Sequence, residues 1–351
     1  MKRFLSFLIF FLLFLSVTFA QKVLFVGNSY TAVNDLPAMV SSIANGMGEE
    51  MTYEMSAPGG CTFQLHLTQS AQYIQQGGWD FVVMQEQSQL PSFPYGQFMN
   101  ESYPYAQQLC EMIRQYNPEA QILFYMTWGR KNGDAQNAPY YPVLATYEGM
   151  DSLLRARYMQ MAQDNQAAVA PVGAVWHYIR DNYPQIELYQ SDDSHPSIYG
   201  TYAAACCFYT VMYKKNPELI TYAPDMDVQY ANLIRQAAKT VAFDSLNTWY
   251  FIDTPDTTHT PDTVGVGNIT SPYVALYPNP VQEWLYVEAA DQNEIEHLYI
   301  YTVEGKKVSS FSFTVEDNMK IDVRTLSPGC YVLELVRRDG RKQVKQFVKT
   351  R

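Results

Sequence analysis

The chain has 351 residues, of which 47% are hydrophobic and 15% aromatic, and its formal net charge at pH 7 is −11. This length suffices for about two domains, and the apolar content suffices for a sizeable core. The negative charge argues against nucleic acid as a partner, because that binding requires clustered Lys and Arg side chains that neutralise phosphates.

The N-terminus has the pattern of a secretory signal peptide. Lys2 and Arg3 precede an apolar run at 4–15, and small residues follow up to Ala20. A charged segment, an apolar segment and small residues before the cut are typical of such a peptide. The apolar run is short for a membrane span, and no second long apolar segment follows. We therefore predict a signal peptide over residues 1–20, a mature chain with no stable transmembrane segment, and a secreted or cell-surface location reached through the periplasm.

The five cysteines show neither a CxxC pair nor the spacing of a zinc site; they are Cys61, Cys110, Cys206, Cys207 and Cys330. An odd number leaves at least one thiol unpaired in an oxidising compartment. Cys206 and Cys207 lie in an apolar stretch and are predicted to be small core residues. The sequence shows no disulfide framework, and we expect neither a metal site nor a cofactor.

Short apolar runs alternate with longer mixed segments from residue 21 to residue 250. Strands are predicted at 23–26, 53–55, 80–84, 122–126 and 167–172, and helices at 36–48, 103–116, 150–165 and 199–214. This alternation predicts an α/β fold with a parallel sheet covered by helices on both faces. Sites in such sheets form at the carboxyl ends of the strands.

The composition changes after residue 250. Residues 251–272 are rich in Thr, Asp and Pro, which is typical of a linker. Residues 273–351 read as short strands separated by turns, predicted at 285–287, 297–303, 306–313, 320–323, 331–337 and 343–348. This pattern predicts a C-terminal all-β sandwich of roughly 80 residues.

Ser29 follows the first predicted strand directly, in the sequence Gly27-Asn28-Ser29. A serine at a strand end can present its hydroxyl at the edge of the sheet, and backbone N–H groups of the turn can face an oxyanion. A helix cap or a phosphate-binding turn is the alternative, although a P-loop would need a Gly and a Lys further along the chain.

A nucleophilic serine needs a general base, and the chain has five histidines. His259 lies in the linker and His297 in the β region. His177 has an apolar helical setting that is typical of a core histidine, whereas His66 stays open as a candidate. His195 lies in a polar turn three residues after Asp192, a spacing that lets the carboxylate reach Nδ1 while Nε2 faces the serine.

Two further segments offer hydrogen-bond donors for an oxyanion. The glycine pair that ends at Gly60 would let a backbone N–H approach a ligand, although a simple turn is the alternative. The strand that ends at Met84 is followed by Gln85-Glu86-Gln87-Ser88, where side-chain amides can donate to an oxyanion. A polar loop without a catalytic role is the other interpretation.

In this order the segments resemble the blocks of SGNH (GDSL-like) hydrolases, over about residues 23–215. Residues 27–29 resemble the GDS block, Gly60 the second-block glycine, 85–88 the position of the third block, and Asp192 with His195 the last block. The resemblance implies a flavodoxin-like three-layer α/β/α fold. It also implies ester hydrolysis by a Ser–His–Asp triad, with an oxyanion hole formed by the N–H groups of Ser29 and Gly60 and one side-chain amide.

The sequence departs from the family at two positions. Asn28 replaces the Asp of the GDS block, and the usual Asn of the third block is absent. Gln87 takes its place in the alignment of strand ends, with Gln85 as its competitor. These features are similar to those of a divergent bacterial branch, in which we expect Asn28, Gln85, His66 and Trp128 to line the substrate site.

The C-terminal region resembles the type A sorting domain of the type IX secretion system, which is found in Bacteroidetes. The resemblance rests on residues 275–280 (ALYPNP), 300–306, 326–332 and a basic end at 345–349. It implies that the secretion machinery is a partner and that the domain is removed after passage across the outer membrane. A carbohydrate-binding sandwich is the alternative, but it lacks an obvious exposed aromatic platform.

Together these features predict a secreted serine esterase that removes acetyl or similar small acyl groups, from glycans or from small-molecule esters. A lipase or thioesterase-like acyl hydrolase is the second hypothesis. A non-catalytic surface protein that binds glycans on the same fold is the third.

Overall fold

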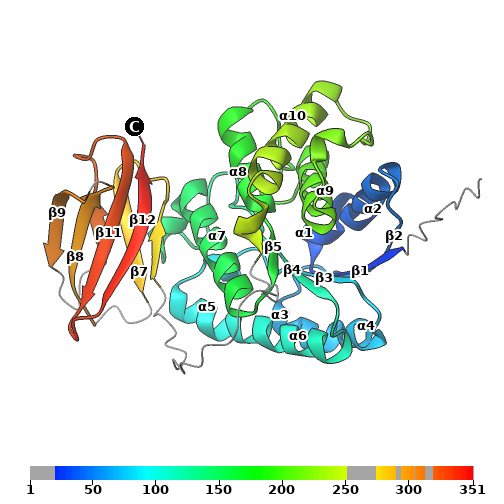
Figure 1. Cartoon of the computed structure of the whole chain (residues 1–351), viewed down its shortest axis with the longest axis horizontal. Coiled ribbons are helices and arrows are strands. Elements are labelled where there is room, and N and C mark those ends of the chain that lie inside the picture. Colours follow the sequence, from blue (N-terminus) through cyan, green and yellow to red (C-terminus); the bar gives the residue numbers. More distant parts are fainter. Residues whose placement is uncertain (1–19, 251–273, 290–293, 304, 313–318, 351) are drawn as a thin grey trace, which may run out of the picture.

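The computed structural model describes residues 20–250, 274–289, 294–303, 305–312 and 319–350. The predicted signal peptide up to residue 19 and the predicted linker at 251–272 lie outside these ranges. An α/β region forms the larger part of the molecule, and a β region packs against its side (Figure 1).

The α/β region contains a five-stranded parallel sheet in the order β2-β1-β3-β4-β5. Its strands are β1 (Gln21–Val26), β2 (Met51–Ser56), β3 (Phe81–Met84), β4 (Gln121–Tyr125) and β5 (Ala168–Ala170). This strand order is the flavodoxin-like doubly wound order. The predicted fold class is therefore confirmed.

Both faces of the sheet are covered by helices, as the continuous apolar run of β1 requires. Val23 and Phe25 point into one core, and Leu24 and Val26 point into the other. The helices of this region are α1 (Ser29–Ala32), α2 (Leu36–Gly46), α3 (Phe63–Gln69), α4 (Ala71–Gln76), α5 (Tyr95–Glu101), α6 (Tyr103–Tyr116), α7 (Tyr147–Asp164), α8 (Val172–Asn182), α9 (Ile198–Tyr213) and α10 (Val228–Ala238). Helices α2, α8, α9 and α10 contribute to the first core, and α3, α6 and α7 to the second.

The β region consists of two antiparallel sheets with one core between them, as predicted for a sandwich. One sheet has the order β10-β7-β6 and the other β12-β11-β8-β9. The strands are β6 (Val274–Tyr277), β7 (Trp284–Ala289), β8 (Ile295–Thr302), β9 (Lys307–Ser312), β10 (Lys320–Asp322), β11 (Gly329–Arg337) and β12 (Lys342–Lys349). Leu285, Ile300 and Leu333 are fully buried in this core.

The β region docks on α7 of the α/β region (Figure 1). The buried guanidinium of Arg157 on α7 forms an ion pair with Glu288 on β7. The hydroxyl groups of Tyr141 and Tyr277 lie 2.8 Å apart across the same contact. Over the described ranges, every helix is too short or too polar to cross a membrane.

All five cysteines lie in the described ranges, and none of them forms a disulfide. Cys206 and Cys207 on α9 are fully buried, as predicted for small core residues.

Candidate active site

Ser29 is the first residue of α1 and follows β1 through a two-residue turn. Asn28 caps the helix, because its side chain accepts a hydrogen bond from the N–H of Tyr30. Only glycine fits at position 27, since a Cβ there would lie 2.3 Å from Thr31 Oγ1 and 2.7 Å from Gln85 Oε1. The turn thus places the half-buried Ser29 hydroxyl at the carboxyl edge of the sheet.

His195 reaches Ser29 from the turn that precedes α9. Its Nε2 lies 2.8 Å from Ser29 Oγ. Its Nδ1 hydrogen-bonds Oδ2 of Asp192, and Oδ1 of Asp192 accepts from the N–H groups of His195 (2.9 Å) and Ser194 (3.1 Å). The structure therefore brings together the three residues that the sequence nominated as a triad.

Asp193 bonds groups other than the imidazole of His195. Its backbone has a φ of 57°. Its carboxylate accepts a hydrogen bond from Asn132 (3.0 Å) and lies 3.9 Å from Lys131 Nζ. Asp192 is thus the carboxylate that orients His195.

The charge distribution favours a base at Nε2 of His195. Partial burial opposes ionisation of Asp192, but hydrogen bonds from His195 and Ser194 lower the pKa of its carboxyl group. A carboxylate at Nδ1 keeps the proton on that nitrogen, so Nε2 can accept the proton of the serine hydroxyl. The side chain of His195 is 31% exposed and that of Asp192 47%, so the site is open to solvent.

Two backbone N–H groups near the serine are available to an oxyanion. Gly60 has a φ of +68° and lies on the surface, and Asn28 Nδ2 donates to the carbonyl of the next residue, Cys61 (3.0 Å). Among the described residues, the N–H groups of Ser29 and Gly60 have no hydrogen-bond acceptor. The resemblance implies that these two groups are oxyanion donors, and that role stays a prediction.

The side chain of Gln87, predicted as the third donor, bonds within its own loop. Its Oε1 accepts from the N–H groups of Gln89 (2.8 Å) and Leu90 (3.1 Å), and its Nε2 donates to Gln89 Oε1 (3.2 Å). One hydrogen of the amide nitrogen is used in this contact and the second is not. The donor role of Gln87 stays a prediction.

The four residues predicted to line the substrate site lie beneath it in this structure. His66, Gln85 and Trp128 are fully buried, and Asn28 is 2% exposed. The ring of His66 bonds Ser70 Oγ (2.6 Å) and the carbonyl of Gly27 (2.9 Å), and burial lowers its pKa to about 4. The polar atoms of these side chains face the protein interior, and the side chains support the turn that carries Ser29.

Trp128 is part of an aromatic stack with Tyr30 and Trp176. Its ring lies 4.7 Å from that of Tyr30 and 3.7 Å from that of Trp176, with interplanar angles of 3° and 10°. Its Nε1 donates to the carbonyl of Ser194 (3.1 Å), the residue before His195. The sequence predicted that Trp128 lines the substrate site, but its ring is fully buried in this stack.

The sequence interpretation missed two residues of the site. Tyr30 packs its ring edge-on against His195 (5.4 Å) and its hydroxyl lies 2.6 Å from Ser194 Oγ. Glu86 is fully buried among hydrogen-bond donors. Their signals were weak: Tyr30 adjoins the serine, and Glu86 is a charged residue at the end of an apolar strand.

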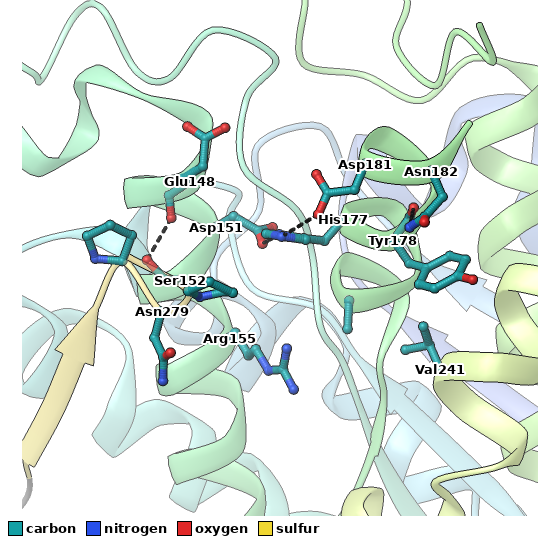
Figure 2. Close-up of a pocket in the computed structure, with 13 residues that line it drawn as sticks. Glu148, Asp151, Ser152, Arg155, His177, Tyr178, Asp181, Asn182, Val241 and Asn279 are labelled. Atoms are coloured by element: carbon teal, nitrogen blue, oxygen red, sulfur yellow. Dashed lines mark hydrogen bonds and ion pairs between the residues drawn. The ribbon is translucent and has the colours of Figure 1, made fainter. Parts of the chain in front are cut away.

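A cavity of about 300 Å³ lies elsewhere, between α7, α8 and Pro278-Asn279-Pro280 of the β region (Figure 2). His177 points into it, bonded to Asp151 (2.9 Å) and facing Asp181 (3.4 Å). His177 is satisfied, as predicted, but its side chain is 28% exposed and so is not a core residue. No triad residue lines this cavity.

Comparison with known proteins agrees with this division of the chain. Residues 275–350 match the family described as the secretion system C-terminal sorting domain. The predicted identity of the C-terminal region is therefore confirmed, and a domain of this family marks the chain for export through its secretion system. No curated protein sequence matches the chain.

Several solved structures are similar to the α/β region. A DUF4886 family protein from Bacteroides uniformis is 18% identical, with a TM-score of 0.57 over 65% of this chain and 96% of that one. An acetyl-xylooligosaccharide esterase from Geobacillus is 18% identical, with a TM-score of 0.40 over 54% of this chain and 92% of that one. A putative GDSL-like lipase from Parabacteroides merdae is 10% identical, with a TM-score of 0.39 over 64% and 95%. The first of these likenesses supports the fold.

Proposed function

We propose that this chain is an exported serine esterase. The observation that carries the proposal is the contact of Ser29 Oγ with His195 Nε2 at 2.8 Å, with Asp192 bonded to the opposite ring nitrogen. A nucleophile, a base and an orienting carboxylate in hydrogen-bond reach are the elements of acyl transfer through a covalent acyl-enzyme.

The reaction follows from these positions. Ser29 Oγ attacks the ester carbonyl carbon while His195 Nε2 takes the hydroxyl proton. The tetrahedral intermediate collapses when the C–O bond to the alcohol breaks, and His195 returns the proton to the leaving oxygen. Water then attacks the acyl-serine with His195 again as base, which releases the carboxylic acid and restores Ser29.

The negative charge on the carbonyl oxygen needs donors that are fixed in advance. The N–H groups of Ser29 and Gly60 supply two of them. The second hydrogen of Gln87 Nε2 supplies the third, because the loop that carries Gln87 begins at the end of β3, at the same edge of the sheet as Ser29.

We assign the acyl group to the acetyl class and the alcohol to a glycan. The hydroxyl of Ser29 is half-buried and His195 is partly exposed, so a small acyl group on a bulky alcohol can reach them from solvent. The sorting domain directs the chain out of the cell, where such glycans are met.

Steady-state hydrolysis of p-nitrophenyl esters of increasing chain length tests the proposal, followed by acetate release from acetylated oligosaccharides. We expect the highest kcat/KM for the acetyl ester and none for Ser29→Ala. A preference for long acyl chains would favour a lipase or thioesterase. No hydrolysis of any ester would favour a non-catalytic glycan-binding protein.

A further inference from the structure

Gln85 is fully buried and forms hydrogen bonds with the turn that carries Ser29. Gln85 Oε1 accepts from Asn28 N and from Thr31 Oγ1, both at 2.9 Å. Gln85 Nε2 donates to Asn28 Oδ1 (3.0 Å). Because the first two partners are donors and the third is an acceptor, the orientation of the Gln85 amide is fixed by its surroundings.

The orientation of the Asn28 amide follows from that of Gln85. Asn28 Oδ1 faces two donors, Gln85 Nε2 and the N–H of Tyr30. Asn28 Nδ2 therefore points the other way and donates to the carbonyl of Cys61. An aspartate at position 28 would place a second acceptor against that carbonyl, and a buried pair of acceptors without a donor is destabilising.

Glu86 binds the segment that follows Gly60 at a second point, two residues after Cys61. Its Oε1 accepts from the N–H groups of Phe63 (2.9 Å) and Gln87 (2.7 Å), and its Oε2 accepts from Ser102 Oγ (2.8 Å). Burial raises the pKa of this carboxyl group to about 7 although all three bonds oppose the shift. Such a group is retained in a core only where its hydrogen bonds are satisfied.

These contacts converge on the short segment that carries Gly60. The carbonyl of Cys61 accepts a hydrogen bond from Asn28, and the N–H of Phe63 donates one to Glu86. Gly60 itself is exposed. We propose that Asn28, Gln85 and Glu86 are positioning residues that lock the Gly60 loop to the Ser29 turn, so that both backbone donors meet one oxyanion. This proposal rests on the proposed esterase function.

The proposal also gives a physical reason for Asn in place of Asp beside the nucleophile. The amide is needed because one position must both accept from Gln85 and donate to Cys61. A loop held in this way acts on the transition state, so its loosening lowers kcat more than it raises KM.

The test compares Asn28→Asp with Asn117→Asp as a matched control. Asn117 is 4% exposed and makes the same kind of bonds: Oδ1 accepts from Trp79 N (3.2 Å) and Nδ2 donates to the carbonyl of Ile74 (2.9 Å). It precedes β4 and so lies at the amino edge of the sheet, away from the carboxyl edge that carries Ser29. We expect both variants to lower Tm, and only Asn28→Asp to lower kcat on p-nitrophenyl acetate, by about a hundredfold with KM nearly unchanged.

A second pair keeps the test informative if Asn28→Asp does not fold. In Glu86→Gln, the amide oxygen can still accept from Phe63 and Gln87, and the amide nitrogen can donate to Ser102 Oγ. Glu86→Ala removes all three bonds. We expect Glu86→Gln to retain kcat within about threefold and Glu86→Ala to lose it to the same degree as Asn28→Asp.

Amide hydrogen exchange over residues 57–67 separates this proposal from the proposed function. Faster exchange in Asn28→Asp and Glu86→Ala, but not in Glu86→Gln or Asn117→Asp, supports the lock even if the wild-type protein proves inactive on esters. Wild-type kcat and wild-type exchange in Asn28→Asp would overturn it. Equal kcat losses in Asn28→Asp and Asn117→Asp would also overturn it, because the effect would then follow stability alone.

Discussion

His195 Nε2 lies 2.8 Å from Ser29 Oγ, although 166 positions separate the two residues along the chain. The parallel sheet makes this contact, because Ser29 follows β1 and His195 precedes α9, which packs on the same face of the sheet as β1 residues Val23 and Phe25. A hydrogen bond between the hydroxyl groups of Tyr30 and Ser194 links the two turns beside this contact.

Ser29→Ala and His195→Ala should each abolish ester hydrolysis and leave the fold intact. Members of a triad act as a unit, so either loss is expected to lower kcat by about four orders of magnitude or more. Steady-state kinetics with active-site-independent controls of Tm and far-UV circular dichroism check this. Near-normal activity of His195→Ala would move the base elsewhere, and the buried position of His66 makes it a poor substitute.

Asp192→Asn should reduce kcat far more than Asp193→Asn. The amide would present the wrong hydrogen-bonding group to His195 Nδ1 and favour the tautomer that carries its proton on Nε2. Asp193 accepts a hydrogen bond from Asn132 instead, so Asp193→Asn should lower activity little. The two variants differ by one position and have the same change of charge. Equal kinetic effects would contradict the assignment of Asp192.

Gln87→Ala should lower kcat by about a hundred- to a thousandfold with little change in KM, which is the effect of removing one oxyanion donor. Gln89→Ala is the control, because it removes the partner of Gln87 in the loop and leaves the Gln87 amide in place. A similar loss of kcat in both variants would show that the order of the loop is required and that the Gln87 amide is not an oxyanion donor. Full activity in both would leave the oxyanion with backbone donors alone.

Glu86 should make the protein less stable as the pH rises from about 4.5 to 7. Its pKa is raised from the usual 4.5 to about 7 by burial, so the folded chain keeps a proton that the unfolded chain releases in this range. The free energy of unfolding then falls as pH rises, by on the order of 3 kcal/mol in total. Chemical denaturation across this pH range should show a smaller fall for Glu86→Gln than for the wild type. Parallel pH profiles for the two proteins would contradict the expectation.

The elements that the sequence identified best were those with strong local signals. The run of buried residues in β1 and the proline-ended helix at 103–116 were found within three residues of their bounds. The helix α4 (Ala71–Gln76) was missed, because only Ile74 in it is buried and its sequence AQYIQQ has no clear period.

The site was predictable where the chemistry follows a strand end and not where it depends on packing. The contacts among Ser29, Asp192 and His195 were predicted from strand-end position and spacing, and the structure contains them. The contact between Glu86 and Phe63 N spans 23 positions and depends on where the first residue of α3 packs relative to the sheet. The same holds for Trp128, whose burial depends on Trp176 and Tyr30 lying on its two faces.

The parallel stack of Tyr30, Trp128 and Trp176 gives the site an optical signature. Three fixed aromatic rings at 3.7–4.7 Å, two of them indoles, form an asymmetric chromophore that produces a near-ultraviolet circular dichroism signal. Such signals vanish when side chains lose their fixed packing even if the helices remain. Because Trp128 bonds Ser194 and Tyr30 adjoins Ser29, the contribution of this stack to the signal depends on the order of the turn that carries Ser29 and of the turn that carries His195, with no substrate present.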